Sequence, residues 1–155
     1  MMSKILLTLS TTRKSNKCIK EAIEIANKGD VTLIILFVID EEIPQKILEK
    51  LTEEGWIGGK PTENLFNAVL DEYTLQGRDK VAEIEELAKS KGIRYKSIIR
   101  KGKFLDEVLS VVESEKVNHI LVTRRKRSSV SRFFLGSAVA ELKKKVPCEV
   151  KIIDE

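Results

Sequence analysis

The sequence contains a single histidine among 155 residues, and this scarcity excludes several kinds of site. With His119 alone, neither a histidine-rich metal site nor a His-x-x-His motif for nucleotidyl transfer can be built. A Ser-His-Asp triad would also depend on this one residue, and the sequence has no Gly-x-Ser-x-Gly turn to hold the serine. His119 begins a predicted strand, at the end away from the expected ligand site. We therefore interpret it as a residue with a local hydrogen bond.

Cysteines and long apolar runs are scarce as well. Cys18 and Cys148 are far apart and lack Cys-x-x-Cys spacing, which argues against a disulfide framework and favours a reducing, cytoplasmic compartment. The longest apolar stretch, 31–39, has the length of a strand and falls far short of the roughly 20 residues that span a bilayer. The formal net charge of +4 is only mildly basic and does not by itself indicate a nucleic-acid binder.

The common phosphate-binding motifs are missing too. There is no Gly-x-x-x-x-Gly-Lys-Ser/Thr sequence, and no Gly-x-Gly-x-x-Gly follows the first predicted strand. Asp106 and Glu107 open a predicted helix, where acidic residues offset the helix dipole, so we interpret them as helix-start residues and not as an acid/base pair. Since no set of residues assembles into an active site, the sequence predicts a binding protein and not an enzyme.

What the sequence does contain is a regular alternation of apolar runs and helical periodicities, which predicts one α/β domain over 1–155. The predicted strands are 4–9, 31–39, 93–100, 117–123 and 148–153, and the predicted helices are 18–26, 74–90, 104–114 and 136–145. Strands separated by helices of this length predict right-handed crossovers and a five-stranded parallel sheet with helices on both faces. Residues 41–73, with two prolines and three glycines, are interpreted as a variable insertion containing short helices at 45–53 and 62–73.

In a sheet of this kind, ligands bind outside the carboxyl ends of the strands, where the strand order reverses. The loops expected there are 10–15, 39–43, 101–103 and 123–137. The last of these begins with the basic run 123–127, Thr-Arg-Arg-Lys-Arg, and also contains Arg132. These five basic side chains would hold an anion through charge-assisted bonds, or would form a solvated basic loop. One short basic run without interleaved aromatic residues makes nucleic-acid binding the weaker interpretation.

The segment 120–140, together with 146–153, resembles the C-terminal signature of the universal stress protein family. In that signature a strand leads into a Gly-x-x-Gly loop, and nine residues later Gly-Ser/Thr opens a helix before Pro-Cys and a last strand. Gly136 and Ser137 match the helix start, and Pro147 and Cys148 match the last strand. Gly102 matches a glycine after the third strand. The resemblance implies an adenine nucleotide alpha hydrolase-like, Rossmann-like fold and a regulatory module of the stress response.

Two parts of the family's ligand motif differ in this sequence. Thr123 and Lys126 stand where the Gly-x-x-Gly glycines belong, and side chains there keep the backbone farther from a triphosphate. After the first strand, 10–12 is Ser-Thr-Thr where nucleotide-binding members have an Asp-Gly-Ser-like turn. The ATP-binding motif is thus degenerate. ATP or AMP stays a candidate ligand, beside a smaller phosphorylated molecule or an acidic protein partner.

The resemblance also implies which residues would line the pocket. In this interpretation, Val38 offers its backbone to a base, while Gly136 and Ser137 hold a phosphate at a helix N-terminus. The full candidate set is Ser10, Thr12, Val38, Gly102, Thr123, Arg125, Arg127, Gly136 and Ser137.

The final strand, Cys148–Ile153, is predicted to lie at a sheet edge, where exposed backbone groups need a cover. In the family this strand pairs with its two-fold mate, so we predict a homodimer through it. Two alternatives stay open for the function. One is a dimer that interacts with proteins independently of nucleotides, and the other is a weak ATP hydrolase.

Overall fold

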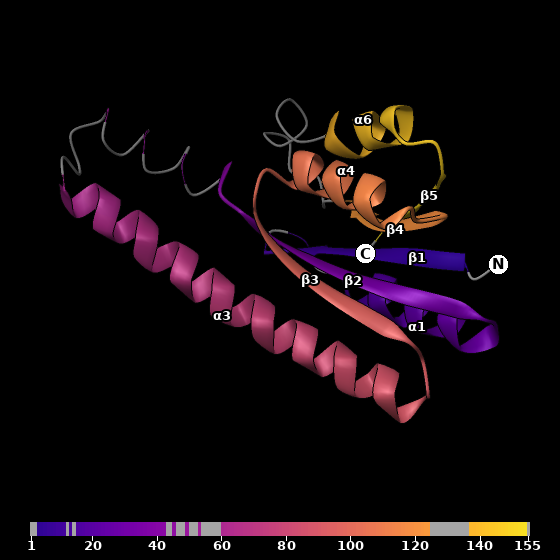
Figure 1. The fold of residues 1–155 in the computed structure, drawn as a ribbon. Helices are drawn as coiled ribbons and strands as arrows, with labels where there is room; N and C mark the ends of the chain where they lie inside the picture. Colours follow the sequence, from indigo (N-terminus) through magenta and orange to yellow (C-terminus); the bar gives the residue numbers. More distant parts are fainter. Residues whose placement is uncertain are drawn as a thin grey trace.

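The computed structural model describes residues 3–11, 13, 15–42, 45, 49, 53, 60–124 and 137–154. The chain alternates between strands and helices (Figure 1). In order, the elements are β1 (Ser3–Ser10), α1 (Asn16–Lys28), β2 (Val31–Asp40), α3 (Lys60–Ser90), β3 (Tyr95–Gly102), α4 (Phe104–Glu115), β4 (His119–Arg124), α6 (Ser137–Lys145) and β5 (Glu149–Asp154).

The strands form one five-stranded sheet in the order β3-β2-β1-β4-β5, and every pairing between neighbours is parallel. This confirms the predicted Rossmann-like architecture. The chain builds outward from β1 through β2 to β3, and then returns to the other side of β1 for β4 and β5. The strand order therefore reverses between β1 and β4, which is where such folds bind ligands.

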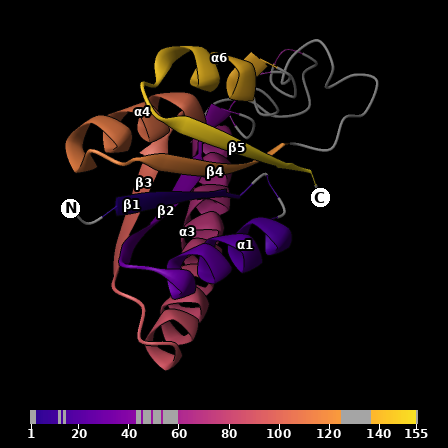
Figure 2. The ribbon, with the colours of Figure 1, turned by 90° about the vertical axis from the view of Figure 1, so that its right-hand side faces the viewer.

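Helices cover both faces of the sheet, as predicted. Helices α1 and α3 lie on one face, and α4 and α6 lie on the other (Figures 1 and 2). Alternate residues of β2 point into the two resulting cores: Leu33 and Ile35 belong to the core under α1 and α3, whereas Ile34 and Leu36 belong to the core under α4 and α6. Because both faces are covered, the strand has the continuous apolar sequence that predicted it.

Helix α3 differs from its prediction. A break was expected between a short helix at 62–73 and a helix starting at Thr74, but α3 runs unbroken from Lys60 to Ser90. The hydroxyl of Thr74 donates to the carbonyl of Leu70 at 2.8 Å, so Thr74 lies inside the helix. Pro61 falls in the first turn, where the missing N–H costs nothing. The helix at 45–53 lies largely outside the described residues, and the interpretation of 41–73 as an insertion stays a prediction.

Smaller differences concern single side chains and strand ends. One leucine of α3, Leu87, is 39% exposed. Cys18 is buried as expected, whereas Cys148 is only half-buried, and both thiols are free. The strand ends agree with the predictions to within two residues.

In the described part of the chain, no helix is long and apolar enough to cross a membrane.

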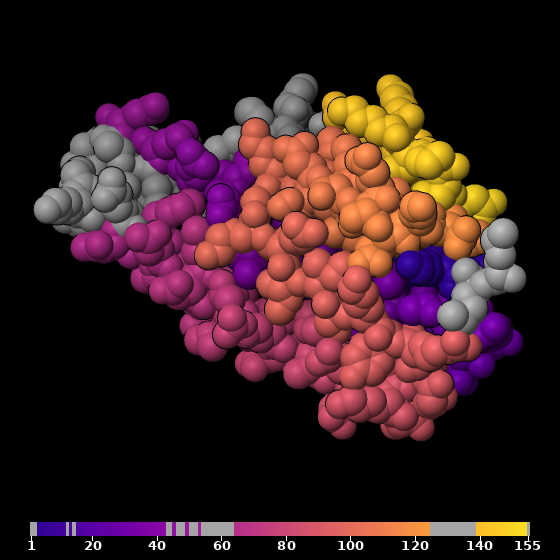
Figure 3. All heavy atoms as spheres, viewed as in Figure 1, coloured from indigo at the N-terminus to yellow at the C-terminus, as the bar shows by residue number. Residues whose placement is uncertain are grey.

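The edge strand β3 is visible on the surface, beside α4 and above α3 (Figure 3). Its exposed side chains are Ile99 and three basic residues, Lys96, Arg100 and Lys101. Charged side chains on an edge strand oppose pairing with another chain. The other edge, β5, has the partly buried apolar residues Val150 and Ile152, which pack against the core under α4 and α6.

Candidate functional site

The carboxyl ends of the strands and the first residues of α1, α4 and α6 lie at the same end of the sheet (Figures 1 and 2). We call this end the rim and define it by Ser10, Asp40, Gly102 and Arg124, the last residues of β1 to β4. Neighbouring strands pair with each other close to this end. Ser10 pairs with Val38, Asp40 pairs with Gly102, and the Glu41 N–H donates to the Gly102 carbonyl at 3.2 Å. The first four strands therefore end on the same side of the sheet, as predicted, whereas residues 125–136 of the last predicted loop lie outside the described residues.

Five of the nine candidate site residues are among the described residues. Ser10, Val38 and Thr123 are buried at the ends of their strands, and Ser137 begins α6. Gly102 has a φ of 152°, a conformation that side chains rarely adopt, and a Cβ there would lie 3.3 Å from Cγ of Glu107. The other four candidates, Thr12, Arg125, Arg127 and Gly136, lie outside the described residues.

Val38 has a more enclosed position than the sequence suggested. It is fully buried and pairs with Ser10 on one side and Arg100 on the other. Ile39 and Asp40 continue β2 past the last residue of β1, and both are buried as well, at 2% and 3% exposure. Backbone contact between Val38 and a base stays a prediction.

Arg13 is the rim residue that sequence reasoning missed, because 10–16 was interpreted only as a polar loop. The residue is 8% exposed. Its backbone N–H donates to the Ser10 carbonyl at 3.4 Å, and its side-chain Nε donates to the Thr123 carbonyl at 3.2 Å. The guanidinium carbon lies 4.0 Å from the centroid of the Phe104 ring. Arg13 thus joins the end of β1 to the end of β4 and to the start of α4.

Hydroxyl groups add further contacts between β1, β4 and α1. Thr8 Oγ1 donates to the Leu121 carbonyl at 2.9 Å, and Thr123 Oγ1 donates to Ser15 Oγ at 3.3 Å. Ser15 occupies the N-cap position of α1, but its side chain makes no capping hydrogen bond. The Ser15 hydroxyl instead lies against Thr123 and donates to the Arg13 carbonyl at 3.5 Å.

A pocket of about 330 Å³ lies beside this network, on the face covered by α1 and α3. Its polar lining consists of hydroxyl, amide and cationic side chains. The lining residues are Leu9, Ser10, Thr11, Arg13, Ser15, Asn16, Phe37, Gln76 and Lys80. Cationic and hydroxyl groups at the start of a helix suit an anion better than a cation.

Two acidic residues of the rim were not considered at the level of sequence. Asp40 is 3% exposed, and its Oδ1 accepts a hydrogen bond from the Glu42 N–H at 2.9 Å, so it shapes the turn after β2. Asp154 lies 3.3 Å from Nε of Arg124 and offsets the first charge of the basic run. Within the described ranges, no three His, Cys, Asp or Glu residues gather in a way that could hold a metal ion.

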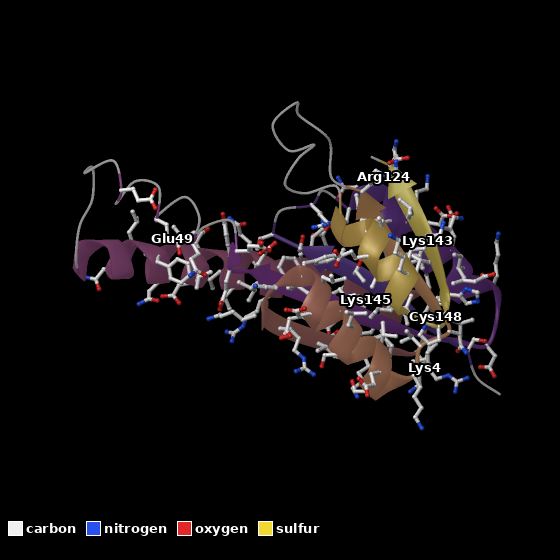
Figure 4. All side chains as sticks on the ribbon, turned by 90° about the horizontal axis from the view of Figure 1, so that it is seen from above. Lys4, Glu49, Arg124, Lys143, Lys145 and Cys148 are labelled. Carbon is white, nitrogen blue, oxygen red and sulfur yellow. The ribbon has the colours of Figure 1, made fainter. Side chains whose placement is uncertain are left out.

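The opposite end of the sheet contains the single histidine. His119 Nδ1 lies 3.2 Å from a carboxylate oxygen of Glu149, which is the local contact expected for a residue at a strand start. Figure 4 shows Lys4 and Cys148 near each other at this end and Arg124 well away from them. Burial raises the pKa of the Cys148 thiol, so this thiol resists forming the reactive thiolate.

Fold and rim together define a Rossmann-like α/β protein whose strand order reverses beside a cluster of polar groups. A sequence model of the universal stress protein family matches residues 1–154, and the chain belongs to this family. Membership connects it with the stress response. A curated relative, universal stress protein MJ0531 of Methanocaldococcus jannaschii, is 19% identical over 153 residues, which cover 99% of this chain and 82% of that protein.

Solved structures of the family share the fold. Universal stress protein UspA from Lactobacillus plantarum matches with a TM-score of 0.74 and 16% identity, covering 97% of each chain. A family protein from Arabidopsis thaliana, solved with AMP bound, matches with a TM-score of 0.55 and 17% identity, covering 99% of this chain and 92% of that one. At these identities the likeness concerns the fold alone.

Proposed function

We propose that this protein is a regulatory module that binds a phosphorylated ligand at the rim, either an adenine nucleotide such as AMP or ATP or a smaller phosphorylated molecule. The observation that carries the proposal is that Ser10 and Thr123 lie at the ends of β1 and β4, the strands on either side of the switch point, with Gly102 and the start of α6 at the same end of the sheet. A helix N-terminus at this place favours an anionic group. The AMP bound to the family protein from Arabidopsis thaliana supports the choice of nucleotide.

We further propose that the protein acts by binding and not by catalysis. The sequence has one histidine, and His119 lies at the amino end of β4, away from the rim. A weak ATP hydrolase is the alternative, and release of phosphate from ATP above the spontaneous rate would favour it. A reducing compartment such as the cytoplasm belongs to the same proposal, supported by the free thiols of Cys18 and Cys148.

A homodimer through β5 completes the proposal. In the described part of the chain, β5 pairs only with β4, so its outer side is open to a second strand. β5 exposes one basic side chain, Lys151, whereas β3 exposes three. A two-fold axis would pair β5 of one copy with β5 of the other, as closed dimers require. A dimer that works through protein contacts alone, without any ligand, is the second candidate function.

The first test is mass spectrometry of the supernatant after denaturing the freshly purified protein, to detect bound adenine nucleotide. Isothermal titration with AMP, ATP and inorganic phosphate then measures affinity. The variant Ser137→Asp places a negative charge at the proposed phosphate position, while an acidic residue in the first turn is favourable for the helix itself. We expect at least a tenfold loss of affinity for the phosphorylated ligands with the fold retained.

The matched control is Ser90→Asp, which introduces the same charge at the far end of α3, an exposed position. It should leave ligand affinity unchanged. Two results would overturn the proposal. One is equal affinity in both variants, and the other is a wild-type protein that binds none of the three ligands yet forms a stable dimer, which would favour the protein-interaction function.

A further inference from the structure

The side chain of Arg13 lies within the set of elements that would surround a ligand at the rim. Its contacts are the Ser10 carbonyl at the end of β1, the Thr123 carbonyl near the end of β4, and the ring of Phe104 at the start of α4. Phe104 directly follows the Gly102–Lys103 turn and is 4% exposed. Arg13 therefore contacts two of the candidate ligand residues, Ser10 and Thr123.

A guanidinium group against an aromatic ring resembles a stacked base. The group is planar and delocalised, and it stacks on aromatic rings as a flat heterocycle does. At 4.0 Å, the guanidinium carbon of Arg13 lies at stacking distance from the Phe104 ring. The ring is thus covered on one face by a group from the same chain, and a nucleobase could stack on that face only if Arg13 moved away.

Arg13 is held in this position by one hydrogen bond from its backbone and one from its side chain. The Arg13 N–H bond to Ser10 closes the turn that follows β1, and the Nε bond to Thr123 fixes the far end of the side chain. Since the residue is 92% buried, moving it exposes the Phe104 ring and breaks a hydrogen bond to a buried carbonyl. A base can enter only by displacing this arrangement, and the displacement lowers its apparent affinity.

We infer that Arg13 is a specificity-determining residue that competes with a nucleobase for the slot beside Phe104, so that the protein selects its ligand mainly through the phosphate. The inference rests on the proposed function, because it concerns the same rim. If Arg13 bound the phosphate itself, replacing it would lower the affinity for AMP and for phosphate.

The first experiment needs no ligand. In ¹⁵N-arginine-labelled protein, the Nε–H signal of Arg13 is assigned by its disappearance in Arg13→Gln, and its exchange with water is measured. We expect a protected Nε–H, since this group donates to Thr123 inside the structure. Exchange as fast as that of an exposed arginine such as Arg78 would overturn the inference, whatever the protein binds.

The second experiment compares titrations of AMP and of inorganic phosphate into the wild type, Arg13→Ala and Arg13→Gln. Alanine opens the slot, while glutamine keeps an amide donor but removes the planar cation and serves if the alanine variant is unstable. We expect AMP affinity to rise at least tenfold in Arg13→Ala, with phosphate affinity changed less than threefold. Arg78→Ala, which removes the same charge from an exposed position on α3, should change neither.

The outcomes separate this inference from the proposed function. If the wild type binds phosphate and AMP but Arg13→Ala binds AMP no better, or more weakly, the base-exclusion role is wrong and the ligand function stands. If no variant binds either molecule while Nε–H is protected, the ligand function fails, and with it the role of Arg13 in selecting ligands. A selective gain of AMP affinity supports both.

Discussion

Gly77 in α3 lies so close to Phe37 in β2 that a Cβ at this position would be 2.7 Å from two atoms of the phenylalanine ring. Phe37 is 5% exposed and belongs to the core under α1 and α3. A ring held in a packed core cannot move aside easily. The glycine therefore permits the close approach of α3 to the sheet, and this explains why a residue that weakens helices is found in the middle of one.

Replacing Gly77 by alanine should therefore destabilise the protein, although alanine is the better helix former by about 1 kcal/mol. Overpacking of a core costs about 1–3 kcal/mol, and the buried contact should outweigh the helix preference. We expect a melting temperature lower by a few degrees, measured by circular dichroism. Gln76→Ala, at the exposed neighbouring position, should change it little.

A double variant tests the cause. Combining Gly77→Ala with Phe37→Leu gives the new methyl group room, so the two changes should cost less together than the sum of their separate effects. Strict additivity, or a Gly77→Ala protein that is more stable than the wild type, would contradict the steric explanation.

Glu115, the last residue of α4, connects three elements at the amino end of the sheet. Its carboxylate pairs with Lys96 of β3 and lies 3.7 Å from Nζ of Lys4 in β1, which also donates to the Glu115 carbonyl at 3.0 Å. The hydrogen bond from Lys96 is the main cause that holds the pKa of Glu115 below its ordinary value of 4.5, with Lys4 adding to the effect and partial burial opposing it.

This lowered pKa predicts a specific pH dependence. A carboxyl whose pKa is lower in the folded than in the unfolded state contributes stability above pH 4.5, and the contribution is lost as the pH falls through the lowered value. At pH 7, Glu115→Gln should therefore lose up to about 1 kcal/mol of unfolding free energy, as is usual for partly exposed pairs. Urea unfolding at pH 7 and near pH 3 should show the difference between variant and wild type shrinking at acid pH.

The control for this experiment is Glu113→Gln, which neutralises an exposed carboxylate on the same helix. Its effect on stability should be small at both pH values. A Glu115→Gln deficit that is the same at pH 7 and pH 3 would mean that the side chain contributes through packing and not through its charge.

The proposed dimer predicts different effects of the same substitution at the two sheet edges. Ile152→Lys places a charge on β5, where it opposes pairing with a second strand. We expect the dimer to become a monomer in light scattering coupled to size exclusion, with circular dichroism showing the fold kept at a lower melting temperature, because Ile152 also packs against the core under α4 and α6. Ile99→Lys makes the corresponding change on β3, at a position that is 38% exposed, and should leave the dimer intact. Dissociation by Ile99→Lys alone would place the interface on the other edge.

Sequence reasoning placed Ser10, Gly102 and Thr123 at one end of the sheet because parallel strands end on the same side. It missed Arg13, since nothing in the run 10–16 indicates that one of its charges is buried. That burial depends on Phe104, which is distant in the sequence and lies against Arg13 only after β4 and α4 have packed. The break expected before Thr74 was wrong because two helical stretches with separate apolar patterns, 62–73 and 74–90, form one continuous helix against the sheet.

The sequence by itself was enough to predict the sheet with helices on both faces and to identify the family. Runs of buried strand residues alternate with helical periodicities, and these are properties of neighbouring residues that do not depend on how the chain packs. Which side chains meet at the rim was decided by the tertiary structure, because contacts such as Arg13 with Thr123 and Gly77 with Phe37 join residues from separate elements. Their distances follow from strand order and helix position, which local patterns do not encode.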